Sequence, residues 1–188
     1  MDFDKILKER HSVRKFKTTK KPNYRQITDI LEAATKNPLA GNIYSIKYLV
    51  VQDKEKIKAL TVAAQQDFFD DVEYIIVVCS DKHNIKTSYE GRAEMYSRQQ
   101  AGAAIQTMLL KITELGLASC WVGAFSDETV KRILKIPDDI DVEAMLPIGY
   151  EMGKGKQSRK PTLDDVMFFD TWRNKFMKPR RVLEGFQT

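Results

Sequence analysis

Apolar residues recur at helical spacing in some stretches of the chain and form short uninterrupted runs in others. The helical spacing predicts four helices: one ending near Arg10, one from Asn23 to before Asn37-Pro38, one after Asp53, and a long one over about 89–115. Uninterrupted runs predict strands at 48–51, 74–79, 117–125 and 145–150, the second covered on both faces. Helices and strands mix without a strict βαβ rhythm, which predicts an α+β fold with one central sheet of four to five strands.

Capping residues mark where several of these elements begin and end. Asn23 followed by Gln26 is a capping-box pattern, and Gly116 is placed as a C-cap glycine. Ser126 or Asp127 is expected to cap a further helix that reaches Leu134. Residues 80–88 are polar and predict an irregular segment, and a proline within the last apolar run predicts a strand edge or a bulge there.

Composition is that of one globular domain spanning residues 1–188, with 43% hydrophobic residues and a net charge of +5. This charge favours either a nucleic-acid surface or anionic ligands, and the even mixing of basic residues with 26 acids favours the second. Cys79 and Cys120 lie in apolar runs, as buried free thiols of a cytosolic protein do. The longest apolar run, 74–79, is shorter than the ~20 residues that span a bilayer, and no signal-peptide pattern opens the chain. We therefore predict a cytoplasmic protein without a membrane association.

The stretch Arg10-His11-Ser12-Val13-Arg14-Lys15-Phe16 gathers three cations within six residues. One interpretation is a solvated basic helix end, where cations also favour the negative end of the helix dipole. The other is an anion site, because a guanidinium can donate two parallel hydrogen bonds to a phosphate.

Other catalytic patterns are missing from the sequence. The chain has two histidines, each expected to be a surface or hydrogen-bonding residue, and no cysteine or carboxylate cluster at metal spacing, so we predict no metal site. No Ser-His-acid arrangement and no phosphate-binding glycine loop occur. What remains are cations at both ends of the chain, Arg10, Arg14 and Arg159, with small-residue loops between them. This set suits a phosphorylated cofactor that brings its own chemistry.

Four patches resemble the FMN-dependent nitroreductase family (short form), in the family's order and along nearly the whole chain. They are Arg10–Phe16, Pro38–Asn42, Leu115–Phe125, and Gly149-Tyr150 with Arg159-Lys160-Pro161 and Leu163–Val166. The resemblance implies a mostly antiparallel sheet flanked by helices and a homodimer in which a tail at about 171–188 packs on the partner subunit. It also implies FMN as cofactor, and ping-pong reduction of nitroaromatic, quinone or similar acceptors by NAD(P)H. The alternative is a flavin-binding redox sensor or interaction protein without efficient turnover.

The resemblance also implies which residues bind the cofactor. Arg10, Ser12 and Arg159 would hold the phosphate and ribityl chain, and Arg14 the N1/O2 side of the ring. Gly123 and Ala124 would lie beside flavin N5, which carries the chemistry without a catalytic side chain. The loop at 38–42 would come from the other subunit, where Leu39 replaces the family's serine. The full predicted cofactor set is Arg10, His11, Ser12, Arg14, Pro38, Leu39, Ala40, Asn42, Gln65, Gly123, Ala124 and Arg159. Phe68 stands where some members have a lysine.

Overall fold

The computed structural model describes residues 2–153, 155 and 157–177. The chain divides into two compact units, Met1–Gln157 and Ser158–Thr188, each of which is described here by itself. In the first unit, the α-helices are α1 (Phe3–Glu9), α2 (Tyr24–Ala34), α3 (Lys54–Ala64), α4 (His83–Ser88), α5 (Ala93–Glu114) and α6 (Asp127–Leu134). Short 3₁₀ turns are η1 (Ala40–Asn42), η2 (Asp67–Phe69) and η3 (Glu90–Arg92), and the strands are β1 (Ile46–Val51), β2 (Tyr74–Ser80), β3 (Ala118–Ser119) and β4 (Asp141–Gly149).

The four described strands form one sheet in the order β1-β2-β4-β3, and every described pairing is antiparallel. This confirms the predicted α+β class with one mostly antiparallel sheet. All seven residues of β2 are buried, as its uninterrupted apolar run predicts. β1 lies at the sheet edge and is less covered than its equally apolar run suggests, since Val50 is 39% exposed.

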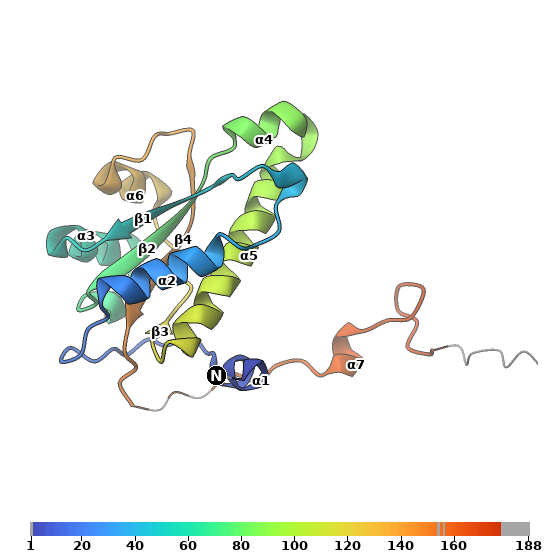
Figure 1. The fold of residues 1–188 in the computed structure, drawn as a ribbon, viewed down its shortest axis with the longest axis horizontal. Coiled ribbons are helices and arrows are strands. Elements are labelled where there is room, and N and C mark those ends of the chain that lie inside the picture. Colours follow the sequence, from blue (N-terminus) through green and yellow to red (C-terminus); the bar gives the residue numbers. More distant parts are fainter. Residues whose placement is uncertain (1, 154, 156, 178–188) are drawn as a thin grey trace, which may run out of the picture. The chain divides into compact units, whose positions relative to one another are not determined.

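Helices cover both faces of the sheet (Figure 1). The apolar cluster on one face includes α3 and α6 residues with Phe16, and the cluster on the other face includes α2 and α5 residues. α5 is the longest helix, and nine of its residues are buried. The predicted central helix is therefore confirmed, although it begins at Ala93 rather than near Tyr89.

Local capping chemistry fixes the helix ends as predicted. Asn23 and Gln26 form a reciprocal capping box at the start of α2. Side-chain oxygens of Asp53 and Ser126 accept the backbone N–H groups of Lys56 and Thr129. Gly116 follows α5 with a φ of +69°, the left-handed conformation in which glycine is favoured.

Three expectations differ from the structure. Residues 80–88 are not irregular throughout, because they contain α4. The run at 117–125 forms only the two-residue strand β3 and an isolated bridge between Val122 and Met145. Pro147 lies in the interior strand β4. The N–H of Met145, two residues earlier, donates to the Val122 carbonyl. Residues two apart in an antiparallel strand turn their backbone groups to the same side, so the nitrogen of Pro147 faces the gap between β3 and this bridge. The missing donor therefore costs no ladder hydrogen bond.

The described part of the second unit contains one short helix, α7 (Leu163–Val166), which opens with a Thr162–Asp165 capping box. Phe168 and Trp172 contact each other with ring centroids 4.8 Å apart. The predicted tail at about 171–188 lies within the described residues only as far as Met177. The predicted single domain and the packing of this tail on a partner subunit stay predictions.

Candidate functional site

The basic stretch Arg10–Phe16 lies along the end of the sheet that is formed by β3 and the end of β4. The N–H of Val13 donates to the Ser119 carbonyl over 2.9 Å. The N–H of Met152 donates to the Lys15 carbonyl over 2.9 Å, and an isolated β-bridge pairs Phe16 with Glu151. α1 ends at Glu9, so this stretch is a backbone-anchored extended segment and not the solvated end of a helix.

Its apolar side chains are buried in the core, whereas most of its polar side chains lie at the surface. Val13 and Phe16 are 5% and 8% exposed. The ring of Phe16 stacks near that of Phe68 at 6.4 Å, and a Cβ added to Gly149 would lie 2.7 Å from it. Ser12 and Arg14 are exposed on the other side. Burial of the apolar residues therefore fixes the direction in which the predicted cofactor-binding residues point.

The outward side chains gather around the buried thiol of Cys120. Burial raises the pKa of Cys120, while the positive charges of Arg14 and Arg10 and a hydrogen bond with Ser12 lower it. Among the described residues, neither arginine forms an ion pair with a carboxylate. Two unneutralised guanidinium groups and a hydroxyl on one surface form a donor set that suits an anion.

The same surface continues along the segment that leads to α6. Gly123 and Ala124 are exposed, and no described residue accepts a hydrogen bond from either N–H. The carbonyl of Ala124 accepts from the Gln66 side chain at 3.4 Å, which places the end of α3 beside this segment. The predicted ligand Gln65 caps α3 in a left-handed conformation, with φ of 52°. The structure thus brings the end of α3 and the loop at 123–124 together.

The predicted loop at 38–42 lies elsewhere on the same chain. Asn37, just before it, accepts from Thr107 of α5, and the Ile43 carbonyl, just after it, accepts from Gln100. Arg10 lies beside a cavity that includes Thr113, further along α5. The loop is therefore displaced by roughly 10 to 20 Å along the helix axis, at 1.5 Å per residue. One chain does not bring Pro38, Leu39, Ala40 and Asn42 to its own Arg10.

Arg159 is exposed and belongs to the second unit. Its predicted pairing with Arg10 around a phosphate stays a prediction.

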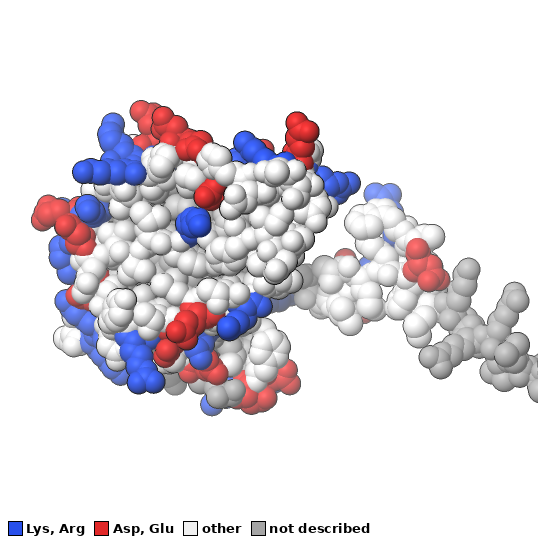
Figure 2. Space-filling view, turned by 45° about the horizontal axis from the view of Figure 1, so that its top comes forward, with Lys and Arg blue, Asp and Glu red and all other residues white. Residues whose placement is uncertain are grey.

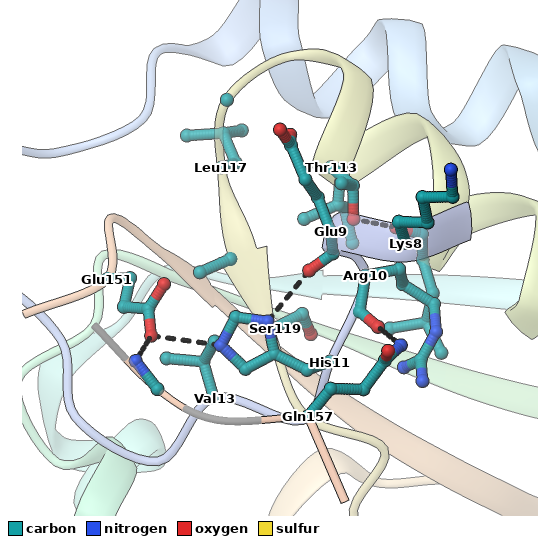
Figure 3. Close-up of a pocket in the computed structure, with 15 residues that line it drawn as sticks. Lys8, Glu9, Arg10, His11, Val13, Thr113, Leu117, Ser119, Glu151 and Gln157 are labelled. Carbon is teal, nitrogen blue, oxygen red and sulfur yellow. Dashed lines mark hydrogen bonds and ion pairs between the residues drawn. The ribbon is translucent and has the colours of Figure 1, made fainter. Parts of the chain in front are cut away.

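A cavity of about 470 Å³ lies beside the basic segment (Figure 3). Arg10, His11 and Val13 line it, whereas Ser12 and Arg14 do not. Its apolar wall comes mainly from α5 and the start of β3. Ser119 also lines the cavity, and its hydroxyl is buried without a hydrogen-bond partner among the described residues.

His11 is held in this cavity by two acceptors. Its Nδ1 lies 2.7 Å from the Glu9 carbonyl, and its Nε2 lies 2.9 Å from Oε1 of Glu151. The predicted ligand His11 therefore contacts protein atoms through both ring nitrogens. Sequence reasoning missed Glu151 as well as Gln66 and Cys120. Glu151 directly follows the Gly149-Tyr150 patch, but a single carboxylate after a strand gives no pattern by which to recognise it.

Within the described ranges, no group of three or more His, Cys, Asp or Glu side chains could hold a metal ion. In the face shown in Figure 2, basic and acidic side chains are interspersed, without the continuous basic stripe that nucleic-acid binding favours. No helix of the described part is both long and apolar enough to cross a membrane.

Comparisons with known proteins agree with this architecture. A model of the nitroreductase family matches residues 7–65 and 60–150. A protein of Archaeoglobus fulgidus, provisionally named an NADH dehydrogenase/NAD(P)H nitroreductase, is 31% identical over 156 residues, which cover 78% of this chain and 83% of the relative. The structure of an FMN-dependent nitroreductase from Clostridium difficile is similar with a TM-score of 0.75 and 25% identity, covering 89% of this chain and 98% of the other. Bacillus megaterium NfrA1 is similar in fold, with a TM-score of 0.83 and 22% identity over 90% of this chain and 74% of the other.

Proposed function

The chain belongs to the nitroreductase family, and on this basis we propose that it is an FMN-dependent oxidoreductase that uses NAD(P)H. The name of the Archaeoglobus fulgidus relative supports NAD(P)H as the donor, and that of the Clostridium difficile structure supports FMN as the cofactor. The proposed acceptor is a nitroaromatic compound, a quinone or a similar small molecule, reduced in a ping-pong cycle.

One observation carries the proposal: Ser12 and Arg14 lie around Cys120, the charge of Arg10 also acts on that thiol, and neither arginine has a carboxylate partner among the described residues. FMN fits this donor set, because it carries a phosphate at one end and a ring that takes up electrons at the other. When bound, FMN supplies the hydride chemistry, so the protein needs no acid or base of its own.

Each group of residues has a proposed task toward the cofactor. Arg10 and Ser12 hold the phosphate end, together with Arg159. Arg14 stabilises negative charge on the N1/O2 side of the ring, since its guanidinium is permanently charged. The N–H groups of Gly123 and Ala124, which donate to no described residue, are available to the ring edge at N5.

We further propose that the enzyme is a homodimer in which the loop at 38–42 completes the site of the partner subunit. The displacement of this loop from Arg10 along α5 supports the arrangement. The small side chains of the loop would contact the flavin, and Leu39, where the family has a serine, gives that wall an apolar character.

The test is the absorption spectrum of the purified protein after incubation with FMN and removal of free FMN, followed by anaerobic titration with NADH and then NADPH. We expect retained FMN and bleaching of its visible absorption by at least one donor. Arg14→Gln should slow this reduction, and the matched control Lys15→Gln, in the same segment, should not. A colourless protein that retains no FMN would exclude the proposal.

A second candidate is a flavin-binding interaction protein without efficient turnover. It is favoured by the exposed apolar side chains of the second unit, where Trp172, Phe176 and Met177 are 80%, 82% and 72% exposed. In the same titration, this candidate predicts bound FMN that neither nucleotide reduces at a useful rate.

A further inference from the structure

We propose that His11 is a positioning residue whose proton holds the Arg10–Ser12 segment in its cofactor-binding conformation, so that flavin binding weakens as His11 loses this proton. The inference rests on the proposed function for its flavin readout. The positioning itself is a property of the protein alone and can be measured without flavin.

Both ring nitrogens of His11 face oxygen atoms, an arrangement that the imidazolium satisfies in full because it has two N–H donors. The Glu9 carbonyl can only accept a hydrogen bond, so Nδ1 must donate to it over 2.7 Å. Oε1 of Glu151 lies 2.9 Å from Nε2 and already accepts from the N–H of Gly155 at 2.7 Å. A neutral imidazole has one N–H, so deprotonation of His11 gives up one of its two hydrogen bonds.

The close packing at Gly155 shows that the arrangement is tightly built. A Cβ added to Gly155 would lie 2.6 Å from Nε2 of His11 and 2.7 Å from Oε1 of Glu151. A side chain at this position would have to displace the His11 ring or the Glu151 carboxylate. The side chains of His11 and Glu151 are 19% and 27% exposed, so the pair is largely shielded from solvent.

These contacts hold the start of the basic segment against residues that follow β4. Gln157 donates from its side chain to the Arg10 carbonyl at 2.9 Å, next to the His11–Glu151 pair (Figure 3). Within the first unit, the pair and this hydrogen bond therefore fix the chain at Arg10 and His11, directly before the predicted phosphate ligand Ser12.

The charged groups around His11 set the direction of the pH effect. On α1 these are Lys8 and Glu9, directly after α1 it is Arg10, and after β4 it is Glu151, whereas the described lining residues from α5 and β3 are uncharged. The Glu9 carbonyl, followed by Glu151, raises the pKa of His11 above 6.5, and burial and Arg10 oppose them. Because the pKa is raised in the folded state, the stabilisation is complete below about 6.5 and is lost as the pH rises through the folded value.

The cofactor's own titration acts in the opposite direction at lower pH. A phosphate monoester gains its second negative charge near pH 6, which strengthens its attraction to arginine. The effect of His11 is therefore isolated by working between about pH 7 and 9.5, where the phosphate is already a dianion.

The experiment has two readouts, NMR titration of the histidine rings without flavin and FMN affinity across the same pH range. The chain has two histidines, so His83→Gln is the matched control. We expect the FMN dissociation constant of the unaltered protein and of His83→Gln to rise about threefold to tenfold with pH, the equivalent of one hydrogen bond. In His11→Gln, whose amide keeps one donor and does not titrate, affinity should be independent of pH. In Glu151→Gln, both the NMR titration of His11 and the affinity midpoint should move to lower pH.

Two results would overturn the inference. One is a pH dependence in His11→Gln equal to that of the unaltered protein. The other is an NMR titration of His11 that does not respond to Glu151→Gln. Absence of FMN binding at every pH would instead defeat the proposed function, and the NMR titration would still decide whether the His11–Glu151 link exists. If His11→Gln does not fold, Glu151→Gln provides the same test through the shift of the midpoint.

Discussion

The basic segment 10–16 and the loop 38–42 are both predicted to bind the cofactor, but the fold supports them in different ways. The segment is anchored by backbone hydrogen bonds to Ser119 and Met152, and it buries Phe16 in the core. The loop has left-handed backbone at Gly41 and Asn42, and its residues are only partly buried or exposed. The segment therefore presents charged groups from a rigid base, whereas the loop presents small residues to something beyond its own chain.

Phe16→Ala should have the largest effect on stability of the changes considered for the two regions. The ring packs against Phe68 and over Gly149, so its loss should lower the free energy of unfolding by about 3–5 kcal/mol. Leu39→Ala, in the half-buried loop, should cost less than about 1 kcal/mol. Urea unfolding measures both, and equal losses would mean that the two regions are supported alike.

Arg10→Ala should separate binding from stability within the segment. Loss of one charge-assisted phosphate contact should weaken FMN binding by about 1.5–3 kcal/mol, which is roughly 10- to 150-fold in the dissociation constant. Fluorescence titration with FMN measures this, and Lys15→Ala is the control with unchanged affinity. Affinity unchanged in Arg10→Ala would show that the segment does not hold the phosphate.

Gly41→Ala tests how the loop keeps its conformation. Both Gly41 and Asn42 have φ of +58°. Alanine at either position would adopt a left-handed backbone conformation, which costs about 1 kcal/mol in conformational free energy. At Gly41 the new Cβ would also lie 2.6 Å from the Tyr89 hydroxyl. We expect Gly41→Ala to be destabilised by about 1–2 kcal/mol and Asn42→Ala by about half as much, measured by thermal unfolding. If Asn42→Ala is the more destabilised, contact with Tyr89 does not restrict the loop.

Glu73→Gln should have the smallest effect on the free energy of unfolding. It removes the partner of Lys21, which follows the basic segment in the sequence. Lys21 and Lys54 hydrogen-bond to Glu73, against the opposing effect of burial, and lower its pKa from 4.5 to about 2. This stabilisation is present above about pH 4.5 and is lost as the pH falls through the folded value. Because these ion pairs lie near the surface, we expect a loss of about 0.5 kcal/mol at pH 7 that vanishes near pH 2. A loss that stays constant over this range would assign the effect to packing.

The sequence predicted much of the fold because local rules decide it. The reciprocal caps at Asn23 and Gln26, the left-handed Gly116 and the fully apolar β2 follow from short-range chemistry. Residues 117–125 did not form the predicted long strand, because pairing with β4 is interrupted between β3 and Val122. That interruption depends on which strand lies beside β4, which no local pattern contains.

For the candidate site, the residue types and their order, from Arg10 through Gly123 to Arg159, were already readable in the sequence. Which of these residues share a surface became clear only from the folded chain. The fold placed Ser12 and Arg14 around Cys120, turned His11 against Glu151, and held the loop 38–42 away from Arg10 along α5. The physical reason is that side-chain direction follows from what the neighbouring residues bury, and those burial partners, such as Phe68 and Gly149 for Phe16, lie far away in the sequence.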